Sequence, residues 1–137
     1  MSALRRAGEQ DVDALLALWA TARTPHAVTS DTAEAVRGLL GRSAVFVADG
    51  DGGGLAGAVI AGWDGWRGNL YRLAVRPEAR RGGLGTALVQ AAEAWLAEQG
   101  ARRISVLVAY EDAVARAFWS SVGYDADGVI GRVVRDL

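Results

Sequence analysis

The feature that most constrains this chain is a strand, a glycine-rich basic loop and a helix start that follow one another within residues 70–89. The strand-like residues end at Pro77, which has no backbone N–H to donate to a sheet. Glycines let a ligand approach the backbone closely, and the first N–H groups of a helix point outward with partial positive charge. The stretch therefore predicts an anion-binding loop, formed by Arg80, Arg81, Gly82, Gly83, Leu84, Gly85 and Thr86.

Two common phosphate-binding motifs do not fit this loop. The dinucleotide fingerprint needs a third glycine, and its position holds Leu88. The nucleoside-triphosphate loop needs a lysine directly before its threonine, and here Gly85 precedes Thr86. The loop therefore predicts an anion that is neither of these two ligands.

Composition restricts the classes of function. The 137 residues suffice for one domain, residues 1–137, with a sheet covered by helices. A formal net charge of −1 argues against broad binding to nucleic acid or to anionic membranes. The absence of cysteine and the single histidine exclude disulfides, a cysteine nucleophile, and thiolate or multi-histidine metal sites. No apolar run reaches the length of a signal peptide or membrane span, so we expect a cytoplasmic monomer or homodimer.

Hydrophobic periodicity and capping residues predict four helices. Asp31 followed by Glu34 resembles a capping box at the start of the second helix. Gly100 is the expected C-cap of the third, and Asp112 is the expected N-cap of the fourth. The predicted helices cover 9–22, a segment from Asp31 to about Gly41, 83–99, and a segment from Asp112 through Val122.

Runs of branched and aromatic residues predict the strands. Asp64-Gly65 lies between two such runs and predicts a tight hairpin, since glycine supplies the positive φ that these turns require. The hairpin places Trp63 and Trp66 on either side of the turn. The predicted strands are 2–7, 44–48, 55–63, 69–75 and 104–109, followed by one or two short strands through 129–130 and 133–134.

Two motifs in this order point to a known family. The order strand, R-P-E-A-R-R-G-G-L-G-T-A-L, helix and strand is followed by a second segment at residues 115–124. Together they resemble the GNAT superfamily of acetyl-CoA-dependent N-acetyltransferases, and the resemblance covers essentially the whole chain. The hallmark Q/R-x-x-G-x-G/A corresponds to Arg80, Gly83 and Gly85. The second motif, N-x-x-A-x-x-[FL]-Y-x-x-x-G-[FY], corresponds to Asp112, Ala115, Phe118, Trp119, Gly123 and Tyr124.

The resemblance implies an α/β fold with a mixed, mostly antiparallel sheet of about six or seven strands, flanked by about four helices. It implies that strand 69–75 splays from strand 104–109 and leaves unpaired backbone groups in the gap. The implied reaction is direct transfer of acetyl from acetyl-CoA to a primary amine, without a covalent enzyme intermediate. The expected partner is an amine-bearing small molecule, an amino acid or a peptide, and nothing in the sequence selects among them.

The resemblance also assigns residues to the cofactor. The amides of about residues 81–86 would hold the pyrophosphate of coenzyme A, with Asp112 and Trp119 also on the cofactor side. Backbone at Val75 would bind the pantetheine arm. The Leu73 N–H would meet the thioester carbonyl, where it stabilises the developing oxyanion.

The residues that move protons in this family are replaced here. The frequent general acid is a tyrosine, and its position holds Trp119, whose indole N–H is not a useful acid. Two common positions for a glutamate base hold Asn69 and Leu107. Three explanations stay open: positioning alone with water carrying protons, a substitute group, or a non-catalytic acyl-CoA-binding or sensor domain. The substitute groups are Tyr71, Tyr110, Tyr124 and His26.

Acceptor candidates follow from strand alternation. Asn69 and Tyr71 share a side with Leu73 and are therefore expected to face the acceptor, although a bulge in the strand would break this alternation. The two hairpin tryptophans either line an acceptor pocket or cap an edge of the core. The histidine is either an acceptor-side group or a solvated loop residue. These further candidates are His26, Trp63 and Trp66.

Overall fold

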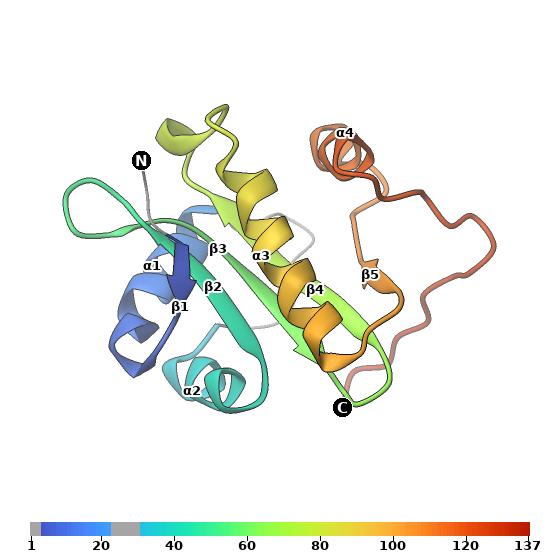
Figure 1. Ribbon diagram of the computed structural model, residues 1–137, viewed down its shortest axis with the longest axis horizontal. Coiled ribbons are helices and arrows are strands. Elements are labelled where there is room, and N and C mark those ends of the chain that lie inside the picture. The colour runs from blue at the N-terminus through green and yellow to red at the C-terminus, as the bar shows by residue number, and fades with distance from the viewer. Residues whose placement is uncertain (1–3, 23–30) are drawn as a thin grey trace. The chain divides into compact units, whose positions relative to one another are not determined.

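The structure is a computed structural model that describes residues 4–22 and 31–137 (Figure 1). The chain divides into two compact units, Met1–Leu107 and Val108–Leu137, and each is described by itself. The first unit contains β1 (Leu4–Arg6), the 3-10 turn η1 (Glu9–Asp11), α1 (Val12–Ala22), α2 (Ala33–Arg42), β2 (Ala44–Asp49), β3 (Leu55–Trp63), β4 (Gly68–Val75), the 3-10 turn η2 (Pro77–Ala79), α3 (Leu84–Gln99) and β5 (Ile104–Val106). The second contains α4 (Ala113–Ser121).

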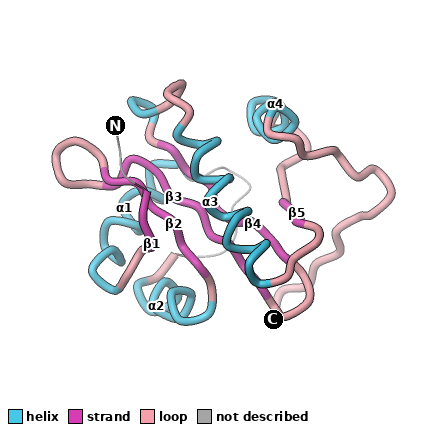
Figure 2. Tube along the Cα trace, in the orientation of Figure 1, coloured by secondary structure: helices cyan, strands magenta, loops and turns pink. Residues whose placement is uncertain are grey.

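One sheet organises the first unit. Its strands run in the order β1-β2-β3-β4-β5 (Figure 2), antiparallel through β4 and parallel between β4 and β5. This confirms a mixed, mostly antiparallel sheet. The expected six or seven strands are wrong, because the described residues form five. The residues expected to form the last strands lie exposed outside any strand, with Val129 at 90% and Val133 at 95% exposure, so no apolar burial favours an extended pairing there.

The helix termini follow from local chemistry. Thr32, rather than the expected Asp31, caps α2, because its hydroxyl oxygen accepts a hydrogen bond from the Ala35 N–H at 3.1 Å. Gly100 ends α3 in the left-handed region at φ 110°, as its position predicted. The helix expected over 9–22 begins as the 3-10 turn η1 before continuing as α1.

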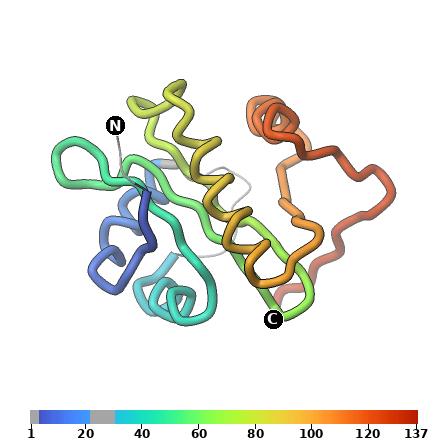
Figure 3. The backbone as a smooth tube through the Cα atoms, in the orientation of Figure 1, coloured from blue at the N-terminus to red at the C-terminus, as the bar shows by residue number. Residues whose placement is uncertain are grey.

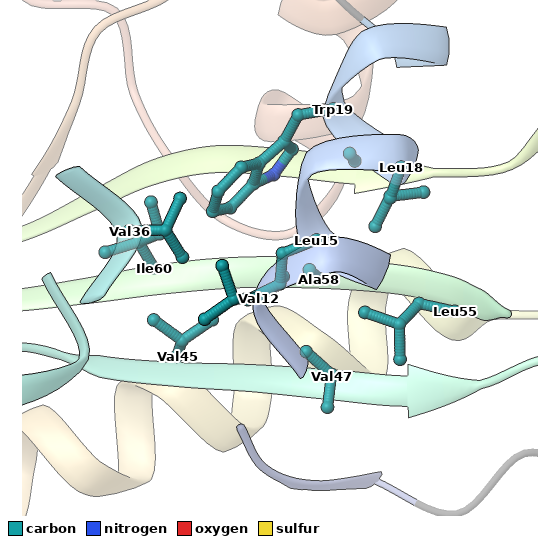
Figure 4. Close-up of a cluster of buried hydrophobic side chains, with 11 residues drawn as sticks. Val12, Leu15, Leu18, Trp19, Val36, Val45, Val47, Leu55, Ala58 and Ile60 are labelled. Atoms are coloured by element: carbon teal, nitrogen blue, oxygen red, sulfur yellow. The ribbon is translucent and has the colours of Figure 1, made fainter. Parts of the chain in front are cut away.

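Helices cover both faces of the sheet. The core on one face joins α1 and α2 to β2, β3 and β4 (Figure 4), while α3 packs across β3 on the other. A Cβ at Gly57 would lie 3.0 Å from Leu88 of α3, so this glycine lets the helix approach the strand. Core side chains include Val12, Leu15, Leu18, Trp19, Val36, Val45, Val47, Leu55, Ala58, Ile60 and Ala74.

A buried carboxylate fixes the first strand to η1. Asp11 is 4% exposed and accepts two hydrogen bonds from the Arg5 guanidinium, both at 2.8 Å, and one from the Gly8 N–H at 2.8 Å. Arg5 also donates to Asp49 at 2.9 and 3.0 Å. The hydrogen bonds from Arg5 hold the pKa of Asp11 below its ordinary value, because they stabilise the charged carboxylate.

The second unit is organised by α4. Asp112 caps the helix, as predicted, by accepting a hydrogen bond from the Ala115 N–H at 2.9 Å. Gly123 follows at φ 96°, and the Tyr124 N–H donates back to the Trp119 carbonyl at 2.9 Å. Within the described parts of the chain, no helix combines the length and the apolar character needed to span a bilayer.

Candidate active site

The glycine loop joins the end of β4 to the start of α3, as Figure 3 shows along the chain. Arg81 and Gly83 both have positive φ, 69° and 81°, so two residues adopt the left-handed backbone conformation just before the helix begins. Gly83 is the N-cap of α3, and the first backbone hydrogen bond of the helix runs from the Ala87 N–H to the Gly83 carbonyl at 3.0 Å. The N–H groups of Leu84, Gly85 and Thr86 therefore have no acceptor within the helix, and no side chain caps them.

Space is open above this helix start. A Cβ built at Gly83 would meet nothing within 4 Å, and one at Gly82 would meet only the Ala79 carbonyl, at 4.0 Å. Both glycines and Arg81 are exposed. A diphosphate needs several N–H donors, positive charge and close access to the backbone. The residues present fit such a group.

Two arginines between β4 and α3 donate hydrogen bonds to backbone carbonyls. Arg80 Nε donates to the Val75 carbonyl at 3.1 Å, and Arg76 Nε donates to the Leu55 carbonyl at 2.7 Å. These bonds fix the loop to the ends of β4 and β3. The backbone at Val75 is expected to bind the pantetheine arm. Its carbonyl already accepts a hydrogen bond from Arg80 and keeps a second lone pair for a ligand.

A bulge interrupts β4 just before the loop. Ala58 of β3 pairs with Ala74, whereas Ile60 pairs with Tyr71, so three steps along β4 oppose two along β3. Arg72 lies in this bulge at φ 52°, a left-handed conformation that costs a non-glycine residue about 1–2 kcal/mol. Leu73 follows it.

The bulge corrects one expectation. Tyr71 pairs with Ile60, whose side chain lies in the core, and Ala74 lies in the same core. Tyr71 and Ala74, three residues apart, therefore point to the same face of the sheet. Regular alternation would place them on opposite faces. The expectation that Leu73 shares a side with Asn69 and Tyr71 by alternation is therefore wrong.

Pairing between β4 and β5 is short. It joins Gly68, Asn69 and Leu70 to residues 104–106, and β5 ends at Val106 instead of reaching residue 109 as expected. Residues 71–75 of β4 have no strand partner on this side among the described residues. An edge of backbone N–H and C=O groups, with Leu73 within it, therefore lies next to the glycine loop.

The acceptor candidates lie around the β3–β4 hairpin and along β4. Asn69 pairs with Gly62, and the Tyr71 ring covers that glycine, since a Cβ there would lie 2.8 Å from Tyr71 Cε2. Tyr71 is 46% exposed. Trp63 ends β3 as predicted, but Trp66 does not lie on the far side of the turn, because the turn spans residues 64–67 and contains it. Trp66 is 77% exposed, with the Arg67 guanidinium 4.7 Å from its ring. His26 lies outside the described residues.

The hairpin turn itself is held by Asp64. Its carboxylate accepts hydrogen bonds from the Arg67 N–H at 2.6 Å and the Trp66 N–H at 2.7 Å. These backbone hydrogen bonds lower the pKa of Asp64 below its ordinary value. Asp64 therefore serves the turn and is not free to act as a base near neutral pH.

The second-motif residues lie in the second unit. Trp119 is 9% exposed and makes edge-to-face contacts with Phe118 and Tyr124, with ring centroids 5.2 and 5.0 Å apart. One carboxylate oxygen of Asp112 is used as the helix cap. The roles of Asp112, Trp119 and Tyr124 toward a ligand stay predictions.

Sequence reasoning missed a cluster beside the bulge. Arg72 Nη2 lies 2.7 Å from Asp31 Oδ1, and Nη1 lies 2.9 Å from Oδ2. The same guanidinium lies over the Trp19 ring at 5.7 Å. No local pattern signals a contact between residues 41 positions apart. The described residues include no group of three side chains that could hold a metal ion.

Comparisons with known proteins agree with this arrangement. A curated relative, acetyltransferase YE1169 of Yersinia enterocolitica serotype O:8 / biotype 1B, is 28% identical over 78 residues, 57% of this chain. The match spans 55% of that relative's length.

Solved structures show the same fold. AAC(6')-Iy, in complex with the bisubstrate analogue CoA-S-monomethyl-acetylneamine, superposes with a TM-score of 0.80 at 19% identity, over 99% of both chains. The aminoglycoside antibiotic 6'-N-acetyltransferase AAC(6')-Ih from Acinetobacter baumannii gives 0.81 at 18% identity, over 100% of this chain and 99% of its own. The family model of the GNAT acetyltransferases matches residues 12–124, from α1 to the end of the second motif. Because that match covers most of the sequence, this chain belongs to the GNAT acetyltransferase family.

Proposed function

We propose that the chain transfers an acetyl group from acetyl-CoA to a primary amine, with residues 1–137 acting as one domain. The observation that carries the proposal is the uncapped start of α3 beside two exposed glycines, in a chain of the GNAT family. A helix start with no side-chain cap leaves its N–H groups available to an external anion.

The loop residues bind and orient the cofactor. The N–H groups of Leu84, Gly85 and Thr86 donate to the diphosphate oxygens, and Arg81 adds positive charge beside them. The tie from Arg80 to the Val75 carbonyl keeps the loop aligned with the open edge of β4. When bound, acetyl-CoA supplies an acetyl group activated as a thioester.

The edge of β4 orients the reacting carbonyl. In the proposal, the Leu73 N–H would donate to the thioester oxygen, on which attack by the amine nitrogen would build negative charge. That charge would pass to the sulfur when the carbon–sulfur bond breaks and coenzyme A leaves. One such preorganised donor contributes about 3 kcal/mol to transition-state stabilisation. Residues 71–75 have no strand partner on the β5 side in the described part of the chain. The Leu73 N–H therefore need not break a hydrogen bond between strands in order to bind the thioester oxygen.

Protons pass through water in this proposal. The ammonium of the acceptor loses a proton before attack, and the leaving thiolate gains one. Asn69 and Leu107 do not titrate, and the indole of Trp119 is 9% exposed. Positioning the amine against a thioester supplies much of the rate without a dedicated base. The side chains that would substitute are Tyr71, Tyr110, Tyr124 and His26.

The acceptor is a primary amine on a small molecule or peptide. An aminoglycoside is included among the candidates because two structural neighbours carry such substrates in their names. The proposed acceptor-side residues are Asn69, Tyr71, Trp63 and Trp66. What supports them is no longer alternation with Leu73 but their position around the β3–β4 hairpin, where Tyr71 is 46% and Trp66 77% exposed.

The test is a measurement of free thiol released from acetyl-CoA in the presence of an amine panel: aminoglycosides, amino acids, polyamines and peptides with free N-termini. The proposal predicts release that depends on one amine class and an acetylated product of the expected mass. The Gly83→Glu variant should release none, because the new carboxylate fills the open space and repels the diphosphate.

The replaced proton-transfer residues favour one rival, a non-catalytic acyl-CoA-binding or sensor domain. Binding of coenzyme A by the wild type, lost in Gly83→Glu, without amine-dependent thiol release across the panel would support the rival and overturn the enzyme.

A further inference from the structure

Arg72 occupies an improbable backbone position for its type. It is one of two described residues other than glycine with positive φ, at 52°, and it lies in the β4 bulge directly before Leu73. Strained conformations of this kind persist only where surrounding contacts determine them. The contacts of the Arg72 side chain therefore decide whether the bulge keeps its shape.

Those contacts are specific and sheltered. Both terminal nitrogens of Arg72 meet both carboxylate oxygens of Asp31, at 2.7 and 2.9 Å, in a two-point geometry. The side chains are 24% and 17% exposed. The guanidinium also lies 5.7 Å from the ring of Trp19, on α1. Arg72 is thus held by Asp31, which lies just before α2, and by Trp19 of α1.

The ion pair between Arg37 of α2 and Glu9 of η1 is a less specific contact. Arg37 Nε donates to Glu9 Oε1 at 2.7 Å, and the side chains are 55% and 69% exposed. It joins α2 to η1, and neither residue belongs to β4. Solvent-exposed pairs of this kind contribute little to order or stability.

We propose that the pair Asp31–Arg72 is a clamp that holds the β4 bulge and so aims the Leu73 N–H at the reacting carbonyl. Asp31 is then a positioning residue that acts through Arg72. The inference rests on the proposed acetyl transfer for its kinetic consequence, whereas the ordering of the bulge is a property of the protein alone.

The clamp has a distinct kinetic signature. Misplacing a reacting group by about 1 Å costs on the order of 100-fold in rate, so partial loosening of the bulge should lower kcat about tenfold. The helix-start amides that hold the diphosphate lie in the loop after β4, outside the bulge. The Kd of coenzyme A should therefore change less than twofold.

The experiment compares Asp31→Asn with Glu9→Gln, which removes the same charge from the exposed ion pair with Arg37. Each variant is assayed for kcat, for the KM of acetyl-CoA and for the Kd of coenzyme A. The ¹⁵N order parameter of the Leu73 amide is measured in the free protein. We expect Asp31→Asn to lower kcat about tenfold and the order parameter from about 0.85 to below about 0.7, with Glu9→Gln unchanged in both.

A charge swap tests whether the pair itself is responsible. The double variant Asp31→Arg with Arg72→Asp should regain order at Leu73 and at least half of the lost kcat, because it restores the pair and aspartate tolerates positive φ. If Asp31→Asn does not fold, the double variant provides the test. A double variant that folds but has a low order parameter at the Leu73 amide would overturn the clamp.

Failure of the clamp and failure of the proposed function give different results. An unchanged order parameter and unchanged kcat in Asp31→Asn overturn the clamp while leaving acetyl transfer intact. A wild type without amine-dependent thiol release overturns the function, and the order parameter then tests the clamp alone. A larger Kd for coenzyme A with unchanged kcat contradicts the positioning role.

Discussion

Replacing Gly83 with alanine separates backbone conformation from side-chain clash at the cofactor loop. Gly83 has φ 81°, and a Cβ there would meet nothing within 4 Å. The left-handed conformation costs an alanine about 1–2 kcal/mol, and no contact of the new methyl group offsets this. For a domain of this size the cost lowers Tm by about 3–8 °C.

The same substitution should weaken cofactor binding. Relief of the strain rotates the peptide that precedes Leu84 and turns the N–H groups of the helix start away from the diphosphate. Loss of one hydrogen bond to a charged group costs about 1.5–3 kcal/mol, so the Kd of coenzyme A should rise about tenfold or more. Isothermal titration calorimetry measures the Kd, and a thermal melt measures the Tm.

Gly100→Ala is the matched control. Gly100 has φ 110° and equally open space, and it lies at the other end of the same helix, about 24 Å away for 16 residues. We expect a similar loss of Tm with an unchanged Kd. Equal affinities in Gly83→Ala and Gly100→Ala would refute the reasoning that the start of α3 binds the anion.

Three further results are expected. Asp11→Asn should lower the free energy of unfolding by about 1–2 kcal/mol in urea titrations, less than a fully buried pair because Arg5 is 35% exposed. Since the pKa of Asp11 is lowered in the folded state, its contribution is present above about pH 4 and lost as the pH falls through the folded pKa, and Asp11→Asn should lack that acid-dependent part. Tyr71→Phe should keep kcat within about threefold if water carries the protons, and a loss beyond 100-fold would identify Tyr71 as the acid or base. Asp112→Ala should lower the free energy of unfolding by about 1 kcal/mol through loss of the α4 cap, and Asp112→Ser should recover most of it, whereas equal stabilities would argue against the capping role.

The sequence predicts helix ends and turns well where a single residue decides the backbone conformation. Gly100 ends α3 and Asp112 caps α4 as predicted, and a hairpin with Gly65 at positive φ joins β3 to β4, although its turn spans residues 64–67 and is longer than the expected Asp64-Gly65 turn. The glycine loop and the order of motifs sufficed to identify the family. In each case the signal lies within a few residues of its consequence.

The rest depends on contacts between distant residues. The β4 bulge shifts the side-chain phase after Tyr71, and no residue type marks it, because an arginine rather than a glycine takes the positive φ. Its partner Asp31 was assigned to a helix cap, a role that Thr32 fills instead. The apolar pairs at 129–130 and 133–134 have strand propensity, but they lie exposed and outside any strand.

The most direct test of the account is a titration of the ¹⁵N-labelled protein with coenzyme A, followed by amide chemical shifts. The account predicts that the largest changes fall on Leu84, Gly85 and Thr86, with a second group at Leu73 and Val75 on the open edge of β4. Saturable binding that leaves these amides unshifted, or shifts confined to other parts of the chain, would contradict it.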